Sequence, residues 1–399
     1  MTKEPATSEN VSAEQRPQAS VPPGGGNGSF VQRVLRTTLL PAAAIVLALL
    51  VGAIFMIASS PLVDGELNPM LPMTAYWALV SGSLGSLNGI INTLVQATPL
   101  VLAGLAVGIG FKAGLFNIGA QGQFLMGALA TAAVGVSVAG LSPIIAIPIA
   151  IAAGMAAGMA YGFIPGFLKA YTGAHEVVTT IMLNFVAIQL VAYIVSGPLR
   201  GAEASFVKTD TIVSAALPIL VGRNGHLGVL FAALAVPAIA WLLFRSTLGF
   251  EIRTVGANPD AARYAGMHPR ALIILTMSIA GLLAGLAGSI EILGQIRHMP
   301  SPYATSVGFD AIAVALLGRA HPVGILFAGL LFGAMRAGAG LMQIQAGIPV
   351  QMINVLQAVI LFFLAADLIV QAVFRLRAEG AGVSELQTVT RSYGEQVAK

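Results

Sequence analysis

The side chains that could do chemistry in this chain are mostly amides. Two sets of amides recur three or four residues apart within apolar stretches: Asn88, Asn92 and Gln96, and Gln351, Asn354 and Gln357. Each set therefore occupies one face of a helix. Uncharged amides both donate and accept hydrogen bonds, which suits a pathway for a neutral, hydrogen-bonding solute. Hydrogen bonding between helices is an equally good interpretation. The candidate pathway residues from these sets are Asn92, Gln96, Asn354 and Gln357.

A third polar group lies in Gly110–Ala128, GFKAGLFNIGAQGQFLMGA, inside sequence that otherwise resembles membrane helix. Glycine at this density weakens a helix, and polar side chains cost free energy in hydrocarbon unless they face protein or a wet cavity. The segment predicts a broken or re-entrant element that lines a path through the bilayer. Asn117 and Gln121 join the candidate pathway residues, and Gln123 is a further possible solute contact.

Charged residues within the apolar stretches are few. Glu176 falls at the predicted start of a helix, where a carboxylate favours the positive end of the helix dipole, so we expect it to have a capping role. Arg336 lies deep in an apolar stretch and needs a partner, for which Asp310 and Asp367 are the candidates. We expect a structural ion pair rather than a transport role.

Several familiar chemistries are missing from the sequence. No lysine has the glycines and the following Ser or Thr of a phosphate-binding loop, and no serine sits in a G-x-S-x-G turn. The 5 histidines are scattered and form no HExxH pair, and the absence of cysteine excludes disulfides and thiolate metal sites. We therefore expect no catalytic residues, no metal site, no cofactor and no enzyme activity.

Composition sets the class of protein. The chain is 57% hydrophobic and only 9% charged, with a mean hydropathy of +0.87. Its apolar segments are mostly about 17–25 residues long, enough to cross the bilayer as helices. The fold class is an all-α membrane protein, a polytopic bundle of about ten helices. A formal charge of +4 gives no reason to expect nucleic-acid binding.

The segments divide the chain into three parts. Residues 1–30 are polar and predict a disordered tail without a signal peptide, residues 31–377 form the membrane domain, and residues 378–399 form a second tail. Arg33 and Arg36 precede the first span, so both termini are expected in the cytoplasm. Predicted spans are residues 38–58, 90–111, 113–135, 143–168, 177–197, 227–244, 271–293, 305–318, 322–342 and 351–373. Within them Gly154, Gly158, Gly162 and Gly166 predict close helix packing.

The most polar connection in the membrane domain is the cytoplasmic loop 245–270. Asn258, Pro259 and Asp260 form a strong helix start, with Asn as cap, Pro at the first position and an acid near the positive dipole end. The helix continues through Ala265, and Gly266 ends it. A short helix on the cytoplasmic face is typical of a docking element for a soluble partner.

Four motifs, in order, resemble the permease subunits of bacterial ATP-binding-cassette importers: GLFNIGAQGQFLMGALA, GAHEVVTTIMLNFVA, STLGFEIRTVGANPDAARYAGM and FDAIAVALLGRAHPVGILFAGLLFGAMRAG. The branch is that of ribose-type sugars and branched-chain amino acids, and within it the nucleoside and simple-sugar permeases. The resemblance covers about Arg36–Phe374. It departs at Gln121, where the family commonly has Glu.

This resemblance implies partners, location and site residues. It implies an ATPase, a second and often non-identical permease, a substrate-binding lipoprotein, the inner membrane, and two related halves whose breaks lie near Gly110–Ala128 and Asp310–Gly324. Carried over to this chain, the ATPase contact comprises Gly256, Asn258, Asp260, Ala261, Ala262 and Gly266.

The expected function is the membrane subunit of an ATP-driven importer that moves nucleosides or a simple sugar by alternating access. An ion-coupled secondary transporter is the alternative. Such a transporter usually needs an ionisable group at the membrane midplane. Here the candidates, Glu291, Asp310 and Asp367, lie near the ends of spans.

Overall fold

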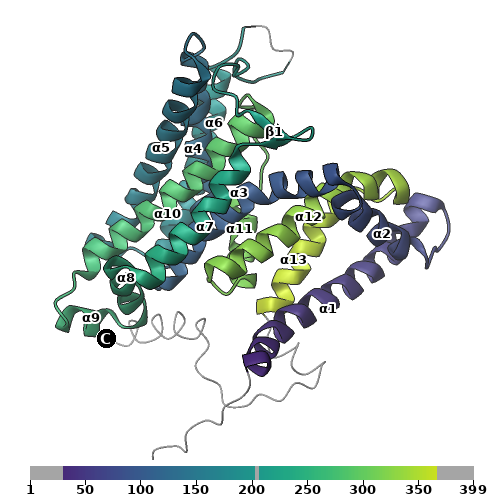
Figure 1. The fold of residues 1–399 in the computed structure, drawn as a ribbon, viewed down its shortest axis with the longest axis horizontal. Coiled ribbons are helices and arrows are strands. Elements are labelled where there is room, and N and C mark those ends of the chain that lie inside the picture. The colour runs from purple at the N-terminus through teal and green to yellow at the C-terminus, as the bar shows by residue number, and fades with distance from the viewer. Residues whose placement is uncertain (1–29, 203–205, 366–399) are drawn as a thin grey trace, which may run out of the picture. The chain divides into compact units, whose positions relative to one another are not determined.

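The structure, a computed structural model, describes residues 30–202 and 206–365, and nearly all of its regular structure is helical (Figure 1). Residues from Leu40 onward form one compact unit, and the chain up to Leu39 belongs to a separate one. The predicted tails, up to residue 29 and from 378, lie outside the described residues. So do Asp367 and the end of the predicted span 351–373.

The elements follow one another as helices joined by turns and loops, with one small hairpin. They are α1 (Phe30–Asp64), α2 (Leu71–Leu84), α3 (Leu87–Lys112), α4 (Ala120–Ser137), α5 (Pro143–Thr172), α6 (Glu176–Ser196), β1 (Ile219–Val221), β2 (Gly225–His226), α7 (Gly228–Arg245), α8 (Thr247–Ala257), α9 (Pro259–Tyr264), α10 (Pro269–Glu291), the π-helix η1 (Ile292–Ile296), α11 (Val307–Leu317), α12 (Pro322–Ala346) and α13 (Met352–Ala365). β1 and β2 pair antiparallel.

Seven helices within the described residues are long and apolar enough to cross a membrane. They are the Ala42–Pro61 part of α1, α3, α5, α6, α7, α10 with η1, and α12. The other three predicted spans correspond to α4, which starts only at Ala120, and to the shorter apolar helices α11 and α13. The polytopic helical fold class is confirmed. Helix α2, between the first two spans, was not predicted.

Glycines set how closely the helices pack. On α5, a Cβ at Gly158 would lie 2.7 Å from the Cα of Gly285, and one at Gly162 would lie 3.0 Å from the Cα of Gly281, both on α10. The predicted glycine ridge is thus confirmed as a seam of backbone contact. In Figure 1, α4, α5 and α10 run side by side, and α4 contacts both other helices. α12 packs on α2 and α3, and most of α3 is buried.

The polar segment Gly110–Ala128 interrupts the helical structure, as predicted. α3 ends at Lys112, and the chain turns through Gly114, whose φ of 69° is left-handed and suits glycine, before α4 begins. Leu115 donates its backbone N–H to the carbonyl of Gly110 across 2.9 Å and closes the turn. A second break separates α11 from α12, where Arg319 and Ala320 have φ values of 52° and 50°. Both breaks lie where the sequence predicted them.

Candidate functional site

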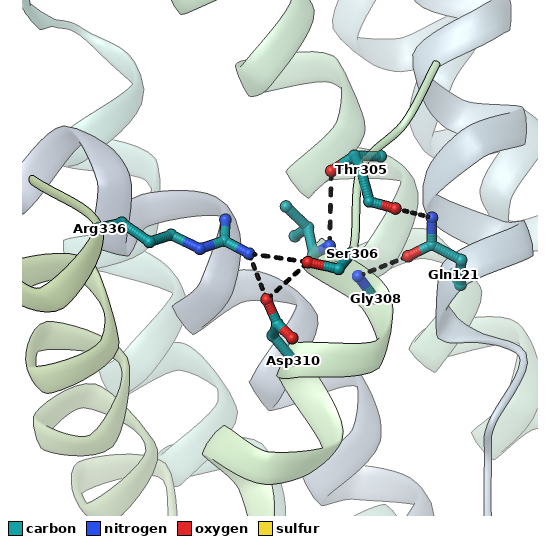
Figure 2. A network of polar contacts seen from close by, with 7 residues as sticks. Gln121, Thr305, Ser306, Gly308, Asp310 and Arg336 are labelled. Carbon is teal, nitrogen blue, oxygen red and sulfur yellow. Dashed lines mark hydrogen bonds and ion pairs between the residues drawn. The ribbon is translucent and has the colours of Figure 1, made fainter. Parts of the chain in front are cut away.

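The centre of the first candidate region is Gln121, in the first turn of α4. Its side chain is 2% exposed. Its Nε2 donates to the Thr305 carbonyl across 2.9 Å, and its Oε1 accepts from the Gly308 backbone N–H across 2.8 Å (Figure 2). Gly308 has no side chain to separate the two elements, so its backbone lies directly against that of Gln121. One amide therefore joins the start of α4 to the start of α11 and satisfies two backbone groups.

The hydrogen bonds continue from there to α12. Ser306 Oγ donates to Asp310 Oδ2 across 2.9 Å, and Arg336 donates to Ser306 Oγ across 3.3 Å and pairs with the Asp310 carboxylate. Figure 2 shows this sequence of contacts. We call it the polar clasp; its members are Gln121, Thr305, Ser306, Gly308, Asp310 and Arg336. The structural ion pair predicted for Arg336 is confirmed, with Asp310 as the partner.

Further amides form hydrogen bonds around the first turn of α4. Asn117 donates to Gln123 across 3.1 Å, and both are 1% exposed. Asn184 on α6 is also buried; it accepts from the Gly122 backbone N–H across 2.8 Å and donates to the Ile118 carbonyl across 3.0 Å. The start of α4 is thus held on α6 as well as on α11. In this conformation the amides of Asn117 and Gln121 are occupied by protein, and their contact with solute stays a prediction.

The two sets of amides at α3 and α13, which we call the amide stripes, differ from this arrangement. Asn92 and Gln96 on α3 are half-buried, and Asn354 on α13 is exposed. Gln357 is 3% exposed, and within the described structure neither its Nε2 nor its Oε1 has a hydrogen-bond partner. A buried amide without partners is costly. Gln357 is therefore the stripe residue that is best placed to gain from a further hydrogen-bonding group. All four remain predictions.

Two carboxylates sit near helix ends. Glu176 begins α6 and is 1% exposed; it pairs with Lys169 of α5 across 3.0 Å. Its location in the first turn is as predicted, and its capping role stays a prediction. Glu291 accepts a hydrogen bond from the Tyr303 hydroxyl across 2.8 Å. Among the described residues, no group of three or more His, Cys, Asp or Glu side chains could hold a metal ion.

The second candidate region is the surface around α9. Asn258 Oδ1 accepts from the backbone N–H groups of Asp260 and Ala261, each across 3.0 Å, so the predicted cap is confirmed. Gly266 has a φ of 83° and ends the helix as predicted. We use the name coupling surface for the exposed residues here: Asp260, Ala261, Arg263, Tyr264 and Gly266.

The predicted ATPase-contact residues do not all face outward. Ala262 is fully buried, and it packs with residues including Ile252, Val255 and Leu272 in a small apolar cluster separate from the main core. Gly256 lies with its backbone against that of Lys112. Tyr264, which the sequence reading did not single out, is 94% exposed. Helical spacing could have found it, because Asp260 and Tyr264 are four residues apart and share the face opposite Ala262.

The coupling surface borders a hollow. A hollow of about 510 Å³ opens between α8 and the start of α10, and Phe250, Glu251 and Gly266 are among the residues that line it. On the neighbouring turn, burial and then the Lys112 ammonium lower the pKa of His321 below its ordinary value. This imidazole, which stacks on Phe244 with ring centroids 5.1 Å apart, is therefore neutral at pH 7.

Comparison with known proteins then assigns the chain to a family. The family described as branched-chain amino acid transport system / permease component matches residues 89–365. The chain belongs to this permease family. It is 39% identical to a guanosine ABC transporter permease of Bacillus subtilis, over 86% of this chain and 97% of that one. It is 35% identical to a nucleoside ABC transporter permease of Lactococcus lactis, over 90% and 98%.

Other relatives include a permease named for glucose and a further permease named for guanosine. A glucose ABC transporter permease of Haloferax volcanii is 34% identical, over 81% of this chain and 86% of its own length. A second guanosine ABC transporter permease of Bacillus subtilis is 28% identical, over 60% and 78%. No solved structure matches. The protein is thus a multi-pass membrane subunit of an ABC transporter, a transport component and not an enzyme, and the secondary-transporter alternative is wrong.

Proposed function

We propose that this chain is the pathway-forming subunit of an importer that takes up nucleosides across the inner membrane by alternating access. The observation that carries the solute class is the near full-length similarity to permeases named for guanosine and for nucleosides, at 39% and 35% identity. A simple sugar is the second candidate because the glucose permease is 34% identical. Both solutes are neutral and rich in hydrogen-bonding groups, which fits a pathway lined by amides rather than charges.

The pathway residues follow from that chemistry. Asn92 and Gln96 are half-buried and Asn354 is exposed in the described conformation, so the chain's own packing does not enclose them. Asn117 and Gln121 are closed off by their protein partners. Their contact with solute requires the start of α4 to part from α11, as a change between outward-open and inward-open states would allow. Gln357 would gain its first hydrogen-bond partners from a solute or from a second subunit.

ATP would be hydrolysed by a separate ATPase that docks on the coupling surface. Support comes from the exposure of Asp260, Ala261 and Tyr264 on a well-capped helix. An exposed aromatic next to charged side chains is a common anchor in protein interfaces. The remaining partners would be a second permease, as the paired guanosine permeases of Bacillus subtilis suggest, and a substrate-binding lipoprotein.

The orientation follows from the distribution of positive charge. Lysines and arginines gather at the helix ends on the side of the coupling surface: Lys112, Lys169, Arg245, Arg253, Arg263, Arg270 and Arg319. Under the positive-inside rule this side faces the cytoplasm, where ATP is available. The N-terminus, with Arg33 and Arg36 before the first span, and the C-terminus would lie on the same side.

Uptake into proteoliposomes tests the solute. The chain, its ATPase and second permease are reconstituted together with the binding lipoprotein, and uptake of radiolabelled guanosine and glucose is measured. We expect ATP-dependent guanosine uptake that excess unlabelled glucose does not reduce and that an ionophore leaves unchanged. Glucose uptake with no guanosine uptake would replace the nucleoside by the sugar. Uptake of neither would overturn both assignments.

Co-purification tests the docking. Asp260→Arg reverses a charge on the coupling surface, and Gly266→Trp adds a large side chain there. Both are expected to reduce recovery of the ATPase with the permease at least tenfold while the chain stays in the membrane. Gly65→Trp is the matched control, because Gly65 is also exposed, has a similar left-handed φ of 77°, and a Cβ there would meet nothing within 4 Å. Unchanged recovery with both surface variants would show that the ATPase docks elsewhere.

A further inference from the structure

At two glycines, the end of α8 lies backbone to backbone against the turn between α3 and α4. A Cβ at Gly256 would lie 2.8 Å from the carbonyl carbon of Ala113 and would overlap the carbonyl oxygen of Lys112. A Cβ at Gly114 would lie 3.1 Å from the carbonyl oxygen of Gly256. Two glycines from distant parts of the sequence thus permit one close approach, and any side chain on Gly256 would separate the two segments.

α9 is joined to the same contact. Buried Ala262 packs in the small cluster that also contains Ala113 and Leu115 of the turn, together with Val255 of α8. The Asn258 N–H donates to the Thr254 carbonyl across 2.9 Å, so α9 follows the end of α8 directly. α8, α9 and the turn therefore share one apolar cluster and one backbone contact.

From the turn, the contacts lead into the polar clasp. The turn runs through Asn117 into α4, where Gln121 bonds Thr305 and Gly308 at the start of α11. Asp310, in the same first turn of α11, pairs with Arg336 of α12. A continuous set of packed and hydrogen-bonded groups therefore connects α9 to α4, α11 and α12.

We propose that the Gly256–Gly114 contact is the mechanical link that passes movement of the coupling surface to the α3–α4 turn and, through Gln121, to α11 and α12. Both glycines are positioning residues that act through the elements they bring together. The inference rests on the proposed docking of the ATPase at the coupling surface. Coupling of this kind is carried by elements that change arrangement together, and it needs a direct measurement of coupling.

Alanine variants with matched controls supply that measurement. Gly114→Ala is compared with Gly173→Ala, because both glycines have a φ of 69° and a Cβ at Gly173 would meet nothing within 4 Å. The strain of a left-handed alanine is therefore the same in both, and only the contact differs. Gly256→Ala is compared with Gly340→Ala, another helical glycine with open space around it.

The readout is solute transported per ATP hydrolysed by the reconstituted transporter, alongside recovery of the ATPase with the permease. We expect Gly114→Ala to retain the ATPase and its basal hydrolysis but to lower transport per ATP at least fivefold, and Gly256→Ala to lower transport per ATP at least as much. Both control variants should stay within twofold of the unmodified chain. An unchanged ratio in both contact variants, with the ATPase still bound at α9, overturns the inference alone. Failure of Asp260→Arg to weaken ATPase binding overturns the docking instead.

A measurement on the unmodified complex covers the case in which the variants do not fold. Hydrogen–deuterium exchange of residues 112–119 is compared between the nucleotide-free complex and the complex with a non-hydrolysable ATP analogue. We expect exchange in this segment to change at least threefold on nucleotide binding, in step with residues 258–266. A change confined to residues 258–266 would show that movement stops at α9, and the inference would be wrong.

Discussion

The polar clasp and the coupling surface are both rich in polar groups, but they use them in opposite ways. In the clasp, Gln121 and Arg336 form hydrogen bonds with groups of the same chain. On the coupling surface, Asp260 and Tyr264 are exposed. A buried polar group that loses its partner leaves another group unsatisfied, whereas an exposed one is replaced by water. Changes to the clasp should therefore cost stability, and changes to the surface should cost association only.

The largest effect is expected from Arg336→Met. The variant leaves the Asp310 carboxylate, which is 18% exposed, without its counter-ion; removing one partner of a fully buried pair costs about 3–5 kcal/mol, which is the upper bound for this part-buried pair. We expect a large fall in the thermal unfolding temperature of the purified protein and little functional protein in the membrane, as measured by fluorescence-detected gel filtration.

The double variant Arg336→Met with Asp310→Asn separates pairing from packing. It removes both charges and leaves a neutral amide beside Ser306, so it should recover more than half of the lost unfolding temperature. A double variant as unstable as the single one would mean that Arg336 contributes through packing and that the ion pair is unimportant.

The next largest effect is expected at Gln121. Gln121→Ala leaves the Thr305 carbonyl and the Gly308 N–H buried without partners, at a cost of about 1–3 kcal/mol each. Gln121→Glu should cost less, because a carboxylate still accepts from Gly308 and a protonated carboxyl can also donate to Thr305. Thermal unfolding should rank Gln above Glu and Glu above Ala. Equal unfolding temperatures for Glu and Ala would show that the bond to Gly308 contributes little.

The sequence predicted the second region better than the first. The cap at Asn258 and the stop at Gly266 are local features, so residue types a few positions apart determine them. The pair Gln121 and Gly308 is separated by 187 residues, and the apolar surroundings of Gln121 predict burial or a pathway equally well. Amide chemistry alone does not say whether the partner is a solute or a backbone. The partner of Arg336 was easier to predict, because a buried charge needs a counter-ion and the sequence offered only two candidate acids, Asp310 and Asp367.

A smaller effect separates the two faces of α9. Ala262 is fully buried in the small apolar cluster, while its neighbour Ala261 is exposed. Ala262→Leu must force three more carbons into a packed site and should cost about 1–3 kcal/mol. Ala261→Leu adds the same atoms to the surface and should leave the unfolding temperature within about one degree. Equal destabilisation by both would mean that α9 is held by more than its inner face.

The smallest effect on stability, and the sharpest test of the comparison, is expected from Tyr264→Ala. This side chain is 94% exposed, so its removal should leave the unfolding temperature unchanged. If Tyr264 anchors the ATPase, binding should weaken by about 1–3 kcal/mol, or roughly ten- to a hundredfold, as surface plasmon resonance in detergent can measure. Tyr264→Phe keeps the ring and should retain most of the affinity. A Tyr264→Ala variant that binds normally would place the anchor on another residue of the coupling surface, whereas one that unfolds would show that this tyrosine belongs with the clasp, among groups that serve the fold.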